Sequence, residues 1–139
     1  ELPPRVTTFE VWEPLHIMRE IWAVGGIGPA RVAVMERVAG PKTGLFGRID
    51  NKPAGAGFVA IHDGIAMIHA LEVLDAHRRK GLGLYMMRQA AFWAQRNRAS
   101  HIALAVTEAN EAANALYAGL GLTPMGGYHY RIKQGETPA

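Results

Sequence analysis

The chain has 139 residues, 49% hydrophobic and 19% charged, which predicts one globular domain with a single core and excludes a disordered chain. Its formal net charge is only +3, and no basic stripe interleaves with aromatic residues, so we expect no nucleic-acid partner. The absence of Cys excludes disulfides, thiolate metal sites and a cysteine nucleophile, and no apolar run approaches the roughly 20 residues of a membrane helix. We therefore expect a cytoplasmic protein without a membrane partner.

The first half of the chain predicts strands around two short helices. Pro14 and Pro29 each stand where a helix can begin, and apolar residues follow both at helical spacing. In chain order we expect a strand over 5–11, helices over 14–24 and 29–39, strands over 43–49, 57–62 and 65–74, and turns at 50–53 and 63–64. The strand over 65–74 is a long apolar run, which predicts burial on both of its faces.

The second half predicts two more helices among the remaining strands. We expect helices over 81–96 and 110–118, and strands over 101–107, 122–125 and 128–133. The order β-α-α-β-β-β-α-β-α-β-β predicts an α/β (α+β) fold with a mixed central sheet of about seven strands and about four helices. The hairpins make its first half antiparallel, and the step from 65 to 107 is a right-handed parallel crossover.

The ends of the chain differ in character from the predicted core. Residues 1–4 (Glu-Leu-Pro-Pro) are typical of a linker, and 134–139 of a frayed tail. The chain begins without an initiator Met, which suggests a fragment or processed product of something longer. No repeat or internal boundary divides it, so we expect a single domain over 1–139.

One segment combines a strand, a tight basic turn and the start of a helix. After Val73 the turn His77-Arg78-Arg79-Lys80 leads into Gly81-Leu82-Gly83. The first amides of a helix lack internal partners and lie at the positive end of its dipole, and glycine lets an anion approach them closely. A pyrophosphate suits this arrangement. The alternative is an ordinary helix start beside a solvated loop.

Two other phosphate motifs fail here. A Walker loop needs four residues between its glycines and then Gly-Lys-Ser/Thr, which the chain lacks. A dinucleotide fingerprint needs a third glycine where Met86 stands, and Gly55-Ala56-Gly57 precedes a strand instead of opening a helix.

These residues resemble the GNAT superfamily of acyltransferases. Arg78-x-x-Gly81-x-Gly83 matches the family's Arg/Gln-x-x-Gly-x-Gly/Ala motif, and Leu71-Glu72-Val73 is similar to the end of its fourth strand. Asn110 to Leu122 resembles the second signature, Asn-x-x-Ala-x-x-Leu-Tyr followed by Gly-Phe, with Leu122 in place of Phe. The resemblance covers essentially the whole chain. It implies the GNAT fold and an N-acetyltransferase that uses acetyl-CoA.

The resemblance assigns coenzyme A contacts to three segments. The backbone of Leu71 and Val73 is expected to pair with the pantetheine arm like an added strand. The start of the helix at Asn110 is expected to contact the cofactor, although Asn110 could equally be a plain N-cap. The pyrophosphate is expected at the remaining cofactor-binding residues, namely Arg78, Arg79, Lys80, Gly81, Leu82, Gly83 and Leu84.

Tyr117 falls on the motif position of the general acid. A phenol with a pKa near ~10 can protonate a leaving thiolate whose conjugate thiol has a pKa near ~8.5. The attacking amine must lose a proton, and strand alternation sends Glu72 to the face opposite Leu71 and Val73, which makes Glu72 the first candidate for general base. His69 is the second candidate. All three side chains also have plain structural interpretations: Tyr117 as core packing, Glu72 as an ion-paired carboxylate, and His69 as a sheet histidine.

The acceptor is expected to be a small-molecule or peptide amine. In this family the loop over 23–29 lies near the acceptor, so Trp22 and Ile27 could line the site, although core packing is the leading interpretation of Trp22. Residues 128–131 could face the same cleft. The histidines share no short metal-ligand spacing, so no metal is expected. A homodimer is compatible with the family. The competing hypotheses are a non-catalytic acyl-CoA-binding or regulatory module and, more weakly, a basic nucleic-acid partner.

Overall fold

One mixed sheet of seven strands organises the molecule, in the order β1-β2-β3-β4-β5-β7-β6. The computed structural model describes residues 5–74, 81–105, 123–125 and 129–133. The elements are β1 (Val6–Val11), α1 (His16–Val24), α2 (Pro29–Arg37), β2 (Lys42–Ile49), β3 (Lys52–His62), β4 (Ile65–Val73), α3 (Leu82–Arg96), β5 (His101–Ala105), β6 (Thr123–Met125) and β7 (His129–Lys133). The predicted mixed sheet is confirmed. The helix predicted over 110–118 lies outside the described residues.

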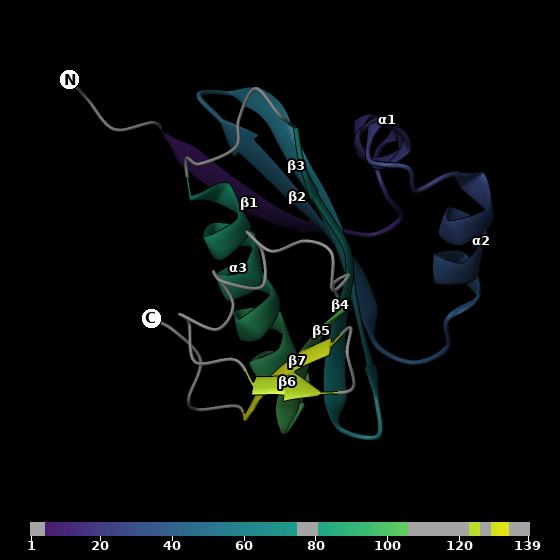
Figure 1. Cartoon of the computed structure of the whole chain (residues 1–139), viewed down its shortest axis with the longest axis vertical. Coiled ribbons are helices and arrows are strands. Elements are labelled where there is room, and N and C mark those ends of the chain that lie inside the picture. The colour runs from purple at the N-terminus through teal and green to yellow at the C-terminus, as the bar shows by residue number, and fades with distance from the viewer. Residues whose placement is uncertain (1–4, 75–80, 106–122, 126–128, 134–139) are drawn as a thin grey trace.

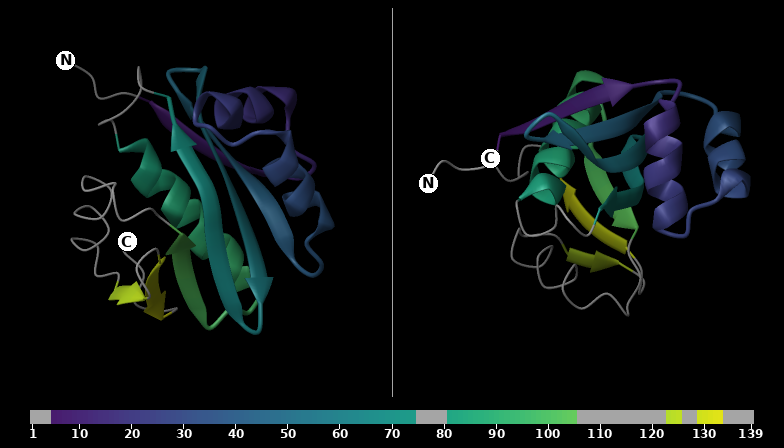
Figure 2. Two further views of the ribbon diagram at one scale, coloured as in Figure 1. Left: turned by 45° about the vertical axis from the view of Figure 1, so that its right-hand side comes forward. Right: turned by 90° about the horizontal axis from the view of Figure 1, so that it is seen from above.

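The helices lie on the two faces of the sheet. Figures 1 and 2 show α3 on one face and α1 and α2 on the other. Buried side chains form one cluster under α3, including Leu82 and Met86, and a second under α1 and α2, including Met18 and Met35. The sheet is therefore the middle layer of three, and residues that alternate along a strand belong alternately to the two clusters.

Strand pairing follows the predicted pattern. β1 to β4 pair antiparallel with their neighbours, and β4 pairs parallel with β5. β7 pairs antiparallel with both β5 and β6. Because α3 connects the two parallel strands, the start of α3 lies near the end of β4, where the basic turn was expected to create an anion site.

The hairpin between β2 and β3 is tighter than the predicted turn over 50–53. Asp50 and Asn51 have φ values of 50° and 65°, the conformation of a two-residue hairpin turn. β3 therefore begins at Lys52 and includes Pro53, which pairs with Arg48 beside a register shift. Proline is tolerated in a strand at such an irregularity, so the prediction that Pro53 belongs to the turn is wrong.

Two glycines bring the first turn of α3 close to the sheet. A Cβ at Gly47 would lie 2.7 Å from Leu82 Cδ1, and a Cβ at Gly55 would lie 2.9 Å from Met86 Sδ. A side chain at either position would force Leu82 and Met86 to move. The small residues of β2 and β3 therefore allow α3 to pack closely on the sheet.

Two other boundaries differ from the expected ones. α2 ends at Arg37, before Gly40, because Val38 is already extended with φ −61° and ψ 127°. The Lys42 ammonium donates hydrogen bonds to the Met35 and Glu36 carbonyl oxygens at 3.1 and 2.7 Å, which caps the last turn. The expected burial of β4 on both faces is wrong. Ala66, Ile68 and Ala70 are buried, but Met67 and His69 between them are half-buried.

Candidate active site

A bulge near the end of β4 organises the candidate site. Ala70 has a positive φ of 55°, and the pairing with β3 shifts from Phe58–His69 to Ala56–Glu72. β4 thus has one more residue than β3 across this interval, as a β-bulge requires. The indole Nε1 of buried Trp22 donates a hydrogen bond to the Ala70 carbonyl oxygen at 2.9 Å, which holds the bulge from the α1 side.

The bulge places the candidate residues on two faces. Leu71 and Val73 pack against the cluster under α3. Glu72 faces α1, because a Cβ at Gly25 would lie 2.4 Å from Glu72 Cδ. His69 also lies on the face of the sheet that α1 and α2 cover, where it lines a cavity. The prediction that Glu72 lies opposite Leu71 and Val73 is confirmed, and both candidate bases share one face.

The parallel ladder between β4 and β5 ends just before the bulge. It runs from the Ile65–His101 pair to the Ile68–Leu104 pair. β4 continues along β3 to Val73, while β5 ends at Ala105. Among the described residues, the β4–β5 pairing thus stops before Leu71, the segment that was expected to hold an extended ligand by strand addition.

The start of α3 has the backbone geometry expected of an anion site. Gly81 is the N-cap residue with φ 79°, a conformation that glycine adopts without strain. Among the described residues no side chain caps this start, and a Cβ at Gly83 would meet no atom within 4 Å. Leu82 is buried against the sheet, so its contribution to a ligand would come from its amide. The described residues thus leave the first-turn amides, at the positive end of the helix dipole, open to an anion.

Several predicted site residues lie outside the described residues. These are Arg78, Arg79 and Lys80 of the basic turn, and Asn110 and Tyr117 of the second motif. Their roles remain predictions. Of the pyrophosphate residues, the structure describes Gly81, Leu82, Gly83 and Leu84, which follow one another at the helix start.

The expectation that Trp22 and Ile27 line the acceptor site is wrong. Their exposed fractions are 0% and 6%, and both belong to the cluster under α1 and α2. Core packing is the correct interpretation of Trp22, which contributes to the site indirectly through the Ala70 carbonyl. Of 128–131, Tyr128 lies outside the described residues, and the other three pair with β5 in the sheet.

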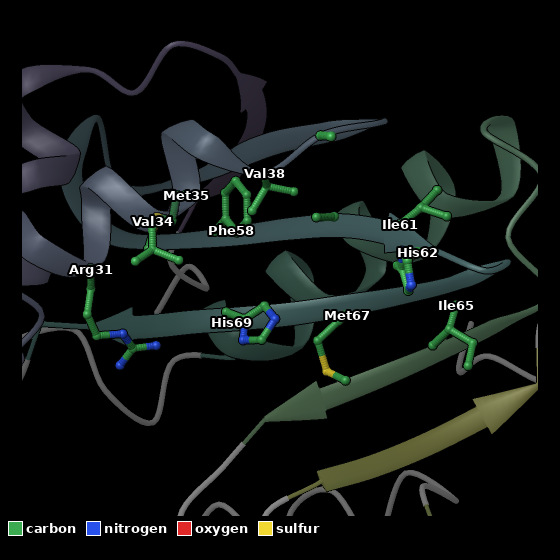
Figure 3. A pocket seen from close by; sticks show the side chains of 12 residues that line it. Arg31, Val34, Met35, Val38, Phe58, Ile61, His62, Ile65, Met67 and His69 are labelled. Carbon is green, nitrogen blue, oxygen red and sulfur yellow. The ribbon is translucent and has the colours of Figure 1, made fainter.

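Sequence reasoning missed a cavity of about 490 Å³ between α2 and the outer half of the β3–β4 hairpin. Figure 3 shows side chains from α2 and from both strands pointing into it. From α2 come residues 31, 34 and 35, which lie on one helix face, and Val38 and Ala39 follow the end of the helix. From β4 come the alternating residues 65, 67 and 69. The helical and strand spacings of these residues were visible in the sequence. That the two sets of side chains line one cavity depends on where α2 packs on the sheet.

The described part of the chain contains no group of three or more His, Asp or Glu side chains that could hold a metal ion. It also contains no helix with the length and apolar character needed to cross a membrane.

Comparison with known sequences gives a consistent result. The Acetyltransferase (GNAT) family model matches residues 12–122. The uncharacterized N-acetyltransferase YobR of Bacillus subtilis (strain 168) is 35% identical over 102 residues, which are 73% of this chain and 41% of that protein. The chain therefore spans less than half the length of this curated relative.

Solved structures share the fold at low sequence identity. The ribosomal-protein-S18-alanine N-acetyltransferase from Escherichia coli superposes with a TM-score of 0.78 at 15% identity, over 94% of each chain. A Bacillus subtilis acetyltransferase in complex with CoA has a TM-score of 0.74 at 14% identity, over 88% of this chain and 79% of that one. At these identities the likeness concerns the fold alone.

Proposed function

The chain belongs to the GNAT acetyltransferase family, and from this premise we propose that it transfers an acetyl group from acetyl-CoA directly to a primary amine. The observation that carries the proposal is that, among the described residues, β5 pairs with β4 only as far as Ile68, while β4 continues along β3 to Val73. A strand-like ligand arm would run along this end of β4, with its anionic end at the start of α3. The CoA complex of the Bacillus subtilis neighbour supports the choice of donor.

The described residues fit coenzyme A at two places. The β4 backbone from Leu71 to Val73 would hold the pantetheine arm by strand addition. The amides from Gly81 to Leu84 would hold the pyrophosphate, since a Cβ at Gly83 would meet no described atom within 4 Å and no acidic residue stands in the first turn. Arg78, Arg79 and Lys80 would add positive charge next to this site.

The chemistry then needs one acid and one base. The amine nitrogen attacks the thioester carbonyl carbon, the carbon–sulfur bond breaks, and the electron pair leaves with sulfur. Tyr117 gives its proton to the thiolate, and Glu72 takes the proton that the amine loses, either directly or through water. A lysine-like amine has a pKa near ~10.4, so a base raises the fraction able to attack. His69 is the alternative base.

The test is a thiol-release assay with acetyl-CoA against a panel of amines, paired with calorimetry of CoA binding. Release of CoA in step with acetylated amine, together with saturable CoA binding, is the expected result. CoA binding without release across the panel would favour the non-catalytic module. A folded protein indifferent to CoA would contradict both interpretations.

A further inference from the structure

The cavity between α2 and the β3–β4 hairpin has a distribution of polar groups that the family assignment does not explain. Its volume of about 490 Å³ lies within the range of small-molecule sites, roughly 300–1,000 Å³. Twelve described residues line it, and nine of them are apolar. The other three are Arg31, His62 and His69, so these twelve residues include no carboxylate.

The basic groups occupy different ends of the cavity. His62 lies at the hairpin end, opposite Ile65, and its Nε2 is 3.2 Å from the Asp63 carboxylate. Arg31 lies near the start of α2, and Figure 3 shows it at the same end as His69, with Met67 and Ile65 farther along β4. Within the described part of the chain Arg31 makes no ion pair, whereas Arg19 on α1 pairs with Glu36 at 3.4 Å. One end of the cavity therefore offers a guanidinium, and the middle is apolar.

The end with Arg31 is also the end next to the proposed reaction centre. His69 directly precedes the bulge at Ala70, and the β4–β5 ladder ends at Ile68. An acceptor amine must come within roughly 3–3.5 Å of the thioester carbon to react. An acceptor in this cavity would thus have its amine at the His69 end and the rest of its body toward Met67.

We propose that this cavity binds the acyl acceptor, and that the acceptor is an apolar α-amino acid whose carboxylate pairs with Arg31; the assignment rests on the proposed function. Such a molecule has its amine and carboxylate on one carbon. With the amine at the His69 end of the cavity, the carboxylate would therefore lie at the same end as the Arg31 guanidinium. Its side chain extends into the apolar middle, where Phe58 and Met67 line the wall. A polyamine fits poorly, because its extra cations would meet the Arg31 guanidinium and the apolar side chains of the described lining.

The test compares L-leucine, L-leucinamide, glycine and spermidine as acceptors with saturating acetyl-CoA. Leucinamide keeps the amine and side chain but lacks the carboxylate, and its amine is less basic, so it would be the better substrate if the carboxylate were irrelevant. We expect kcat/KM for leucine to exceed that for leucinamide by roughly tenfold, the value of one charge-assisted contact at a solvated rim. Glycine should be at least roughly tenfold poorer than leucine, because it buries no side chain. Spermidine should be the poorest.

Variants on α2 separate binding from folding. Arg31→Gln should raise the KM for leucine roughly tenfold with little change in kcat, and should leave the KM for leucinamide unchanged. Arg31→Lys should recover part of the loss. Arg37→Gln is the matched control, since Arg37 lies on the same helix but does not line the cavity.

Three outcomes would overturn the inference. The first is a kcat/KM for leucinamide or spermidine that equals or exceeds the kcat/KM for leucine. The second is an Arg31→Gln variant in which the KM values for leucine and leucinamide change equally. The third applies if the protein binds CoA but acetylates none of the amines. In that case, a failure of L-leucine to bind the CoA complex in calorimetry would overturn the inference. If acetyl-CoA is cleaved with another amine, only this inference fails. If CoA itself does not bind, the proposed function fails as well.

Discussion

The indole of Trp22 and the carbonyl of Ala70 connect α1 to the bulge in β4 through a buried hydrogen bond of 2.9 Å. Ala70 has φ 55°, a conformation that costs a non-glycine residue about 1–3 kcal/mol unless its surroundings hold it. The bulge is what sends Glu72 toward α1 while Leu71 and Val73 pack toward α3. A core tryptophan therefore sets the geometry of the proposed active site without touching a substrate.

Trp22→Phe tests this coupling. The substitution keeps an aromatic ring but removes the donor, which leaves the Ala70 carbonyl without this partner and should lower the free energy of unfolding by about 1–3 kcal/mol. Turnover measured where the variant remains folded should also fall, because Glu72 and His69 flank the bulge. Urea unfolding and the thiol-release assay measure the two effects. Trp12→Phe is the control, since Trp12 packs on the Phe58 ring while the hydrogen bond to the Ala70 carbonyl comes from Trp22, and equal turnover losses in both variants would argue against the coupling.

Gly25→Ala tests the position of the Glu72 carboxylate. A Cβ at Gly25 would lie 2.4 Å from Glu72 Cδ and 2.6 Å from Oε2, so the carboxylate must move. The φ of Gly25 is −81°, which alanine adopts freely, so little stability should be lost. Because misplacing a reacting group by about 1 Å can cost roughly a hundredfold, we expect kcat to fall by roughly 10- to 100-fold.

The control for Gly25→Ala is Gly28→Ala. Gly28 has φ −89°, and a Cβ there would meet no described atom within 4 Å, so its kcat should stay close to that of the original chain. Adding Gly25→Ala to Glu72→Gln should produce little further loss, since both changes affect one group. Full activity in Glu72→Gln would remove Glu72 as the base and leave His69 as the candidate.

The sequence predicted those parts of the site that depend on local periodicity. Alternation along β4 was enough to separate Glu72 from Leu71 and Val73, and the glycines after the basic turn were enough to predict the start of α3. The bulge at Ala70 was not predictable, because alanine gives no sign of a positive φ and the conformation is held by a hydrogen bond from Trp22, 48 residues away. The same bulge explains why Trp22 belongs to the core although it lies next to the expected acceptor loop.

Tertiary packing also decided the features that sequence reasoning missed. Pro53 was expected to end a turn, but a register shift beside Arg48 accommodates it inside β3. The cavity exists because α2 packs on the β3–β4 hairpin at a distance that leaves space between them. No local sequence pattern predicts that distance. Because Met67 and His69 line this space, β4 is less buried than an apolar run suggests.

The two glycines at the start of α3 should respond to alanine with opposite signs. Gly81 has φ 79°, so Gly81→Ala should destabilise the fold by about 1–2 kcal/mol. Gly83 is helical and a Cβ there would meet no described atom within 4 Å, so Gly83→Ala should stabilise the fold by about 0.5–1 kcal/mol. The same methyl would stand where the pyrophosphate is proposed to approach, and should raise the KM for acetyl-CoA roughly tenfold. Thermal unfolding and initial rates check both effects, and a stabilised Gly83→Ala enzyme with unchanged KM would move the pyrophosphate elsewhere.

Tyr117→Phe tests the proposed acid directly. The phenol is proposed to meet sulfur as the carbon–sulfur bond breaks, so its loss should affect the transition state much more than the bound ground state. General acid catalysis is worth roughly 10²–10⁴-fold, and we expect kcat to fall within that range while the Kd for acetyl-CoA changes less than about threefold. Tyr85→Phe is the matched control, because Tyr85 is an exposed tyrosine on α3. A Tyr117→Phe enzyme with unchanged turnover would mean that the thiolate leaves without this proton, as its lower basicity permits, and that Tyr117 is packing.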